Sequence, residues 1–563
     1  MTESLSKKIK LENDKECNVG ITKYRFECDK VSGSIKTVSY DFIVEEVDLE
    51  GNVVELKDMP VPMVKKISKV DNNEWFTAFK QSSIIKEYYN EEEIEKVIVK
   101  FEEIIEANSG AFSFKMIENK AHRTEIHKLF KSMSQLHSKA ANNLIEIHFG
   151  KESSRKPMTN WKDLGGDHLE FCLCKSNIDT IQAIEEIARR AKLNSKVFSY
   201  AGTKDKKACT IQLVRANRVL AQRLANMKFV YDENREKQIK LGNFKYVKEP
   251  LRLGDCFGNR FIVIIRNVNL NSIEDLNSIF QPLQKLGFIN YFGMQRFGNS
   301  SVGTHDLGKC VVLQKWEEFV NLLLLPRSGD SDQIAHARLN YKTNKDPEQA
   351  IRLFPSNCIA EKCVLSHLKH SPTDFHGAFK KIPRNLKTMY AHAFQSYIWN
   401  TIVSIRISKY GFELRKGDLI LNHLKEVGRN ERNVKEAFPI EITDQNINKY
   451  TIYDLVLPCP GEDSIYPVNM ADDYEELLCQ LNITQQDWTS DPQLNLSGSY
   501  RHVVGKPIDL EYSVHHYDEL APLHSIFHDD IDLEKKGEHI AIKIGVTLKT
   551  SNYVTMLLRQ VLE

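Results

Sequence analysis

The stretch GTKDKK at 202–207 places one carboxylate among three lysines. Apolar, strand-like residues precede and follow it, so a tight loop between two strands is expected. Neighbouring cations favour the charged form of a carboxylate, which is the form that a nucleophile or general base needs. Asp205 is therefore a candidate catalytic residue, although surface loops with solvated charges and no catalytic role are common. The spacing differs from that of a phosphate-binding glycine loop, which argues against a nucleotide-dependent enzyme.

A second unusual stretch, NYFGMQRFGN at 290–299, crowds aromatic, amide and arginine side chains around two glycines. Glycines let a backbone approach closely, rings offer stacking faces, and amides can read the edge of a base. Such a loop could hold an unstacked nucleobase. The alternative is a tight turn whose phenylalanines anchor the core.

The strand-like run DFIVEE at 41–46 alternates in a way that puts Phe42, Val44 and Glu46 on one face. A carboxylate that accompanies two apolar side chains toward a core needs a partner. By contrast, the aromatic-rich helical pattern at 391–400 is more typical of a core than of a site.

The segments that must position these residues show two kinds of apolar spacing in turn: every second residue, as in strands, and every third or fourth, as in helices. A hairpin is expected from Gly33, with its turn at 50–52, and the C-terminal strand and helix are expected to return to the first sheet. The other expected elements are helices at 91–106, from 122, at 177–192, 271–286 and 385–409, and strands at 168–175, on both sides of 202–207, at 260–268 and within the strand-rich stretch 455–467.

Composition sets further bounds. A chain of 563 residues, 41% of them hydrophobic, exceeds what one core usually serves, so at least two domains are expected. The net charge is only +1, so any basic nucleic-acid surface must be local. No run reaches the ~20 apolar residues of a membrane span, and the N-terminus lacks the apolar core of a signal peptide. We therefore expect no membrane association and residence in the nucleus, the cytoplasm or both.

Taken in order, the motifs resemble the TruD family of RNA pseudouridine synthases, especially its eukaryotic branch. The resemblance runs from about Gly33 to the end of the chain. It rests on DFIVEE at 41–46, KSNIDTIQAI at 175–184, FSYAGTKDKKACTIQ at 198–212, NYFGMQRFGN at 290–299, PRSG at 326–329, IPRNLKTMYAHAFQSYIWN at 382–400, LPCPG at 457–461 and SNYVTMLLRQVL at 551–562.

The resemblance implies an α+β (mixed α/β) fold. Its catalytic core would have a mixed, largely antiparallel sheet with flanking helices, built from 26–50, 160–299 and 500–563. A TruD-type α/β insertion domain would occupy 300–499, and a smaller helical insertion of the eukaryotic type 51–159. Residues 1–25 are expected to form a polar tail.

The resemblance also implies roles for individual residues. Asp205 falls on the catalytic aspartate of the family's G-x-K-D motif, and Lys36 on its basic active-site residue. Phe42 and Glu46 match the family's F-x-V-x-E strand, while Asn290 and Phe292 match the loop that contacts the target base. The substrate-binding candidates are Phe42, Glu46, Lys204, Asn290, Phe292, Gln295 and Arg296.

The implied reaction is isomerisation of uridine in RNA, with the target base flipped into the cleft. The reaction needs no redox agent, so neither a cofactor nor a metal is expected. Transfer RNA is the first expected substrate, with small nuclear RNA and messenger RNA as further candidates, and the chain is expected to be a monomer. The alternative is a non-catalytic RNA-binding or chaperone protein on the same fold. Asp205 argues against it, because a carboxylate facing RNA phosphates gains nothing for binding.

Overall fold

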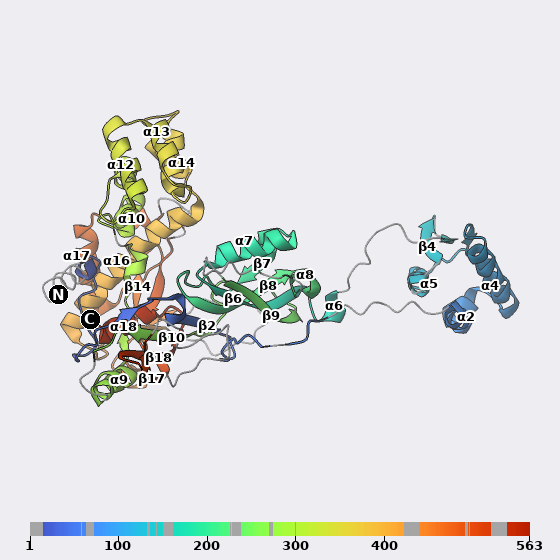
Figure 1. Ribbon diagram of the computed structural model, residues 1–563, viewed down its shortest axis with the longest axis horizontal. Helices are drawn as coiled ribbons and strands as arrows, with labels where there is room; N and C mark the ends of the chain where they lie inside the picture. Colours follow the sequence, from blue (N-terminus) through green and yellow to red (C-terminus); the bar gives the residue numbers. More distant parts are fainter. Residues whose placement is uncertain are drawn as a thin grey trace.

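The computed structural model of the chain describes residues 15–57, 59–62, 72–131, 136–141, 144–149, 161–225, 227, 238–269, 274–298, 300–421, 438–489, 494, 496–518 and 537–562. Within these residues, nine strands form one sheet that joins the two ends of the chain (Figure 1). The main order is β17-β18-β10-β2-β8-β6-β9, with β1 beside β10 and β7 beside β8. The strands are β1 (Ser34–Ile35), β2 (Phe42–Val47), β6 (His168–Ser176), β7 (Phe198–Tyr200), β8 (Cys209–Asn217), β9 (Gln238–Val247), β10 (Gly258–Arg266), β17 (Ile508–Tyr517) and β18 (His539–Lys549).

The β2–β8 pair is parallel and the other pairs of this sheet are antiparallel. The C-terminal strand β18 lies against β10, which confirms the predicted return to the first sheet. The predicted N-terminal hairpin is confirmed at its turn, where Val47 and Val53 form an antiparallel bridge and the Val54 N–H donates to the Glu46 carbonyl oxygen at 2.8 Å. The hairpin is short, because the rest of β2 pairs with the distant strands β10 and β8.

Helices cover the two halves of the sheet over separate apolar clusters. The helices α7 (Thr180–Ala191) and α8 (Ala221–Ala225) pack on β6, β8 and β9, while α9 (Glu274–Leu286) and α18 (Val554–Val561) pack beside β10 and β18. In Figure 1, α7 lies along the β6–β8–β9 half. The side chain of Asp179 caps α7 by accepting the Gln182 N–H at 2.9 Å.

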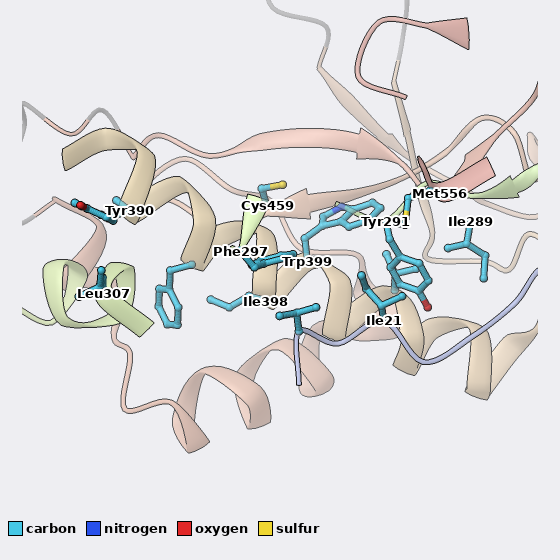
Figure 2. Packing of buried hydrophobic residues seen from close by; sticks show 14 of the residues in the cluster. Ile21, Ile289, Tyr291, Phe297, Leu307, Tyr390, Ile398, Trp399, Cys459 and Met556 are labelled. Atoms are coloured by element: carbon cyan, nitrogen blue, oxygen red, sulfur yellow. The ribbon is translucent and has the colours of Figure 1, made fainter. Parts of the chain in front are cut away.

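The long helix α16 (Arg384–Tyr410) organises the remaining part of the chain. Its apolar residues share one cluster with the sheet, and Figure 2 shows Tyr390, Ile398 and Trp399 within that packing. A Cβ on Gly308 would come 2.0 Å from the Tyr390 carbonyl oxygen, so glycine lets α10 approach α16 directly. The helices are α10 (Thr304–Val312), α11 (Trp316–Leu324), α12 (Asp332–Asn344), α13 (Pro347–Leu353), α14 (Ile359–Leu368), α15 (Phe375–Lys380) and α17 (Ala471–Gln480).

Short strands accompany these helices. Four of them form a sheet in the order β13-β12-β14-β15, and β11 pairs with β16. Their bounds are β11 (Phe288–Ile289), β12 (Leu419–Leu421), β13 (Pro439–Glu441), β14 (Leu455–Cys459), β15 (Ser499–His502) and β16 (Val504–Gly505). Together, the helices and the largely antiparallel sheet confirm the α+β class.

The segment between β2 and β6 carries a small folded unit with its own aromatic core, and Figure 1 draws it apart from the large sheet. It contains the predicted helix at 91–106, but also a three-stranded sheet that the sequence did not predict. The elements are α2 (Asn72–Gln81), α3 (Ser83–Tyr88), α4 (Glu91–Glu106), β3 (Ala111–Ser113), α5 (Lys120–Lys131), β4 (Leu136–Ala141) and β5 (Leu144–Phe149), followed by α6 (Trp161–Leu164). None of the helices described for the chain combines the length and apolar character needed to cross a membrane.

Candidate active site

Asp205 lies in the loop between β7 and β8, and its carboxylate is approached from two other segments. The Lys36 ammonium nitrogen is 3.9 Å from Asp205 Oδ1, and Gln295 donates from Nε2 to the same oxygen at 3.5 Å. The side chains of Asp205 and Lys36 are about one quarter exposed, so both can meet a bound molecule. The fold thus brings together three of the predicted site residues from distant parts of the chain.

Lys36 is held above an aromatic ring. Its ammonium lies 3.8 Å from the centroid of the Phe42 ring, a cation–π contact. Lys36 also has a φ of 56°, a left-handed conformation that costs a non-glycine residue roughly 1–2 kcal/mol. The following turn is fixed by Asp41, whose Oδ1 accepts from Arg266 Nε at 2.8 Å inside the core. Phe42 is 1% exposed, so its ring supports Lys36 rather than offering an open face.

The backbone of the Asp205 loop is fastened by side chains from β6, α7 and β8. Lys175 donates from Nζ to the Asp205 carbonyl oxygen at 2.8 Å and to the Lys204 carbonyl oxygen at 3.4 Å. The Thr180 hydroxyl accepts the Lys204 N–H at 3.0 Å and donates to Gln212 Oε1 at 2.9 Å. Gln212 in turn donates from Nε2 to the Gly202 carbonyl oxygen at 2.9 Å. These bonds fix the loop on both sides of the catalytic candidate.

The Lys204 side chain points away from solvent and pairs with Glu46 on β2. The two charged groups are 3.0 Å apart and their side chains are 7% and 1% exposed. Lys204 also donates to Asn259 Oδ1, and Glu46 accepts the Leu213 N–H at 3.2 Å. The partner that Glu46 was predicted to need is therefore Lys204. Both residues lie beneath the loop in this geometry, where they support it.

The stretch that holds Gln295 also lines a cavity of about 370 Å³. Gln295 and Arg296 are consecutive in the 3-10 helix η3 (Met294–Arg296); the first reaches Asp205 and the second lines the cavity. The walls come from η3, α16, β15 and the β18–α18 connection, with Phe292 among them. Pockets of about 300–1,000 Å³ commonly hold small ligands and single groups of larger ones.

The side chains of Asn290 and Phe292, which both line this cavity, differ in burial and in their partners. The Asn290 side chain is buried; its Nδ2 donates to the His502 carbonyl oxygen at 3.2 Å, and its Oδ1 accepts from Arg501 at 2.8 Å. The Arg501 guanidinium lies 4.2 Å from the Phe292 ring centroid, and burial lowers the pKa of Arg501 to about 10. Phe292 is only partly buried and meets Trp399 edge-on at 5.4 Å. Asn290 therefore orients Arg501, which covers Phe292.

Lys175, Thr180, Gln212 and Arg501 were not among the residues predicted for the site. A lysine at 175, at the end of an otherwise apolar strand, was a usable signal for the first of them. Arg501 had no comparable signal, because its contact with Asn290 spans 211 positions. In the part of the chain that the structure describes, no cluster of three or more histidine, cysteine or acidic side chains could hold a metal ion.

Comparison with known proteins agrees with this architecture. Residues 145–561 match the family model for tRNA pseudouridine synthase D (TruD). Pseudouridylate synthase 7 homolog of Homo sapiens is 32% identical over 97% of this chain and 81% of its own length. Multisubstrate pseudouridine synthase 7 of Schizosaccharomyces pombe is also 32% identical, over 97% of this chain and 90% of its own.

A solved structure supports the fold as well. It is a Methanosarcina mazei protein described as a TruD, and it superposes with a TM-score of 0.58 over 98% of both chains at 19% identity. The sequence matches span most of the chain and carry the name of the enzyme. The chain therefore belongs to the TruD family and is an RNA pseudouridine synthase.

Proposed function

We propose that this enzyme isomerises uridine with Asp205 as its catalytic carboxylate. The observation that carries the proposal is the meeting of Lys36 and Gln295 at one oxygen of Asp205, beside the cavity lined by Phe292 and Arg296. The Lys36 ammonium and the Gln295 amide both face that oxygen, so together they fix where the carboxylate points. A surface loop with solvated charges would need neither contact.

The reaction breaks the N1–C1′ bond of uridine, turns the uracil while it is held, and forms a C5–C1′ bond. The C5 proton leaves and N1 regains a proton, so atoms and charge balance without an oxidant or reductant. Asp205 can act at C1′ as a nucleophile, or it can remove a proton from the sugar. Lys36 would hold the carboxylate in place, so its loss should lower the rate more than the affinity for RNA.

The target nucleotide must leave its stack to reach Asp205, as enzymes that act on bases generally require. Phe292 is the proposed stacking surface, with the buried Arg501 behind it. Four of the predicted substrate-binding side chains are buried or paired within the protein, so they are proposed to support the binding surface from beneath. These are Asn290, Phe42, Glu46 and Lys204. Gln295 reaches the carboxylate and its neighbour Arg296 lines the cavity, and these two are the proposed substrate contacts.

The proposed substrates are transfer RNA, with small nuclear RNA and messenger RNA as further classes, met in the nucleus or the cytoplasm. The name of the S. pombe relative, a multisubstrate enzyme, supports a range of RNAs. A non-catalytic RNA-binding role is the rival, and it would make the Asp205 environment unnecessary.

The test incubates the purified protein, without added cofactors, with total RNA from cells that lack the enzyme, and then maps new pseudouridines. We expect new sites with the wild type and none with Asp205→Asn, which keeps the side-chain shape. Asp444→Asn is the matched control, because Asp444 is an exposed acid paired with Lys416. Modification by Asp205→Asn would refute the catalytic assignment, and a silent wild type would favour the binding role.

A further inference from the structure

The side chain of Lys175 is an unusual feature behind the catalytic loop. It stands near the end of β6 and has no exposed surface. A buried ammonium normally needs a carboxylate partner, because taking it out of water costs free energy. Within the described residues, no acidic group lies within 4 Å of it to form an ion pair, and the donors are used on backbone carbonyl oxygens instead.

These carbonyls belong to Lys204 and Asp205, so they are the backbone carbonyls just before and just after the Asp205 Cα. We propose that Lys175 is a positioning residue, whose ammonium holds the two carbonyl oxygens and thereby aims the Asp205 side chain at the substrate. The inference rests on the proposed role of Asp205. Lys175 is not among the residues that line the cavity, and its hydrogen bonds go to the backbone of the loop, so its effect on the reaction would pass through the loop.

A purely structural role would not call for a lysine at this position. Methionine has a similar length and would fill the same space without the cost of burying a charge. Residues that weaken a fold are expected where function requires them. Lys175 carries a cost in folding free energy, because burial disfavours its charged form and lowers its pKa to about 8. The nearby groups Asp205, Asp179 and Cys209 raise this pKa, and Lys204 lowers it further.

The charge on Lys175 sets how the reaction rate should depend on pH. Below about pH 8 the ammonium is charged and binds both carbonyls most strongly; above it, the neutral amine holds them less firmly. Wild-type enzyme should therefore show a falling rate above this pH as the loop loosens. An enzyme without a titrating group at position 175 should lack that falling limb.

The test compares Lys175→Met with Lys240→Met, a control that makes the same change at an exposed lysine on the neighbouring strand β9. Four quantities are measured: urea unfolding, RNA dissociation constant, single-turnover rate under saturating enzyme, and the pH profile of that rate. For Lys175→Met we expect unfolding at an equal or higher urea concentration, wild-type RNA affinity, and a rate lower by on the order of 10- to 100-fold, as for a misplaced catalytic group. The falling limb above pH 8 should disappear, and Lys175→Arg should recover part of the rate.

A wild-type rate and pH profile in Lys175→Met would overturn the proposal, as would failure of both the Met and Arg variants to fold, since Lys175 would then be structural. Asp205→Asn is assayed in parallel to separate this inference from the proposed function. If Asp205→Asn keeps its rate, the catalytic assignment fails. If Asp205→Asn is inactive while Lys175→Met is normal, only the inference about Lys175 fails.

Discussion

The buried pair of Glu46 and Lys204 gives a quantitative prediction about what supports the catalytic loop. Glu46→Gln preserves the shape of the side chain and its acceptor for the Leu213 N–H, but it leaves the Lys204 ammonium buried without its counter-ion. Breaking a buried ion pair by removing one partner costs about 3–5 kcal/mol. Lys204→Met leaves the opposite charge alone and should cost a similar amount.

The assay is a double-mutant cycle by urea unfolding, with RNA affinity measured on each folded variant. Glu46→Gln with Lys204→Met removes both charges, so its loss of unfolding free energy should be smaller than the sum of the single losses by about 2 kcal/mol or more. RNA affinity should change little, because both side chains are buried. Additive losses would refute the pairing, and weaker RNA binding at unchanged stability would show that these residues contact substrate instead.

Glu45, which precedes Glu46 in β2, and Phe292, which lines the cavity, give two more predictions. Burial raises the pKa of Glu45 to about 7 from 4.5, so the folded protein binds more protons than the unfolded chain between these values and stability falls as pH rises through that window. Glu45→Gln should therefore raise the unfolding free energy at pH 8 by up to ~3 kcal/mol and give no gain near pH 4, measured by urea unfolding at both values; an equal gain at both would contradict this reasoning. Phe292→Leu should lower kcat/KM for RNA on the order of 10- to 100-fold, because a base–ring stack contributes about 1–3 kcal/mol; urea unfolding measures separately the loss of its contacts with Trp399 and Arg501. An unchanged kcat/KM would remove Phe292 from the binding surface.

The local chemistry of the site was predictable from sequence where it depended on short motifs. The loop around Asp205 and the strand face that carries Glu46 could be predicted from the spacing of residues within one segment. Outside the site, the same holds for the helix at 91–106. The partner of Glu46 could not be named, because Lys204 reaches it only when β2 and β8 lie side by side.

What the sequence missed depends on contacts between distant segments. The predicted hairpin forms only next to its turn, because β10 and β8 occupy the rest of both edges of β2. The small sheet between β2 and β6 has strands of three to six residues, too short for a clear period of two. The burial of Asn290 became visible only with Arg501, 211 positions further along the chain, placed against it.

The release of tritium from RNA labelled at C5 of uracil tests the central claim most directly, because pseudouridine is complete only when C5, newly bonded to C1′, has lost that hydrogen. We predict that wild-type enzyme and Asp444→Asn release tritium into water without any added cofactor. Asp205→Asn should bind the same RNA but release tritium at least about a thousand-fold more slowly. Release by Asp205→Asn at the wild-type rate would contradict the account.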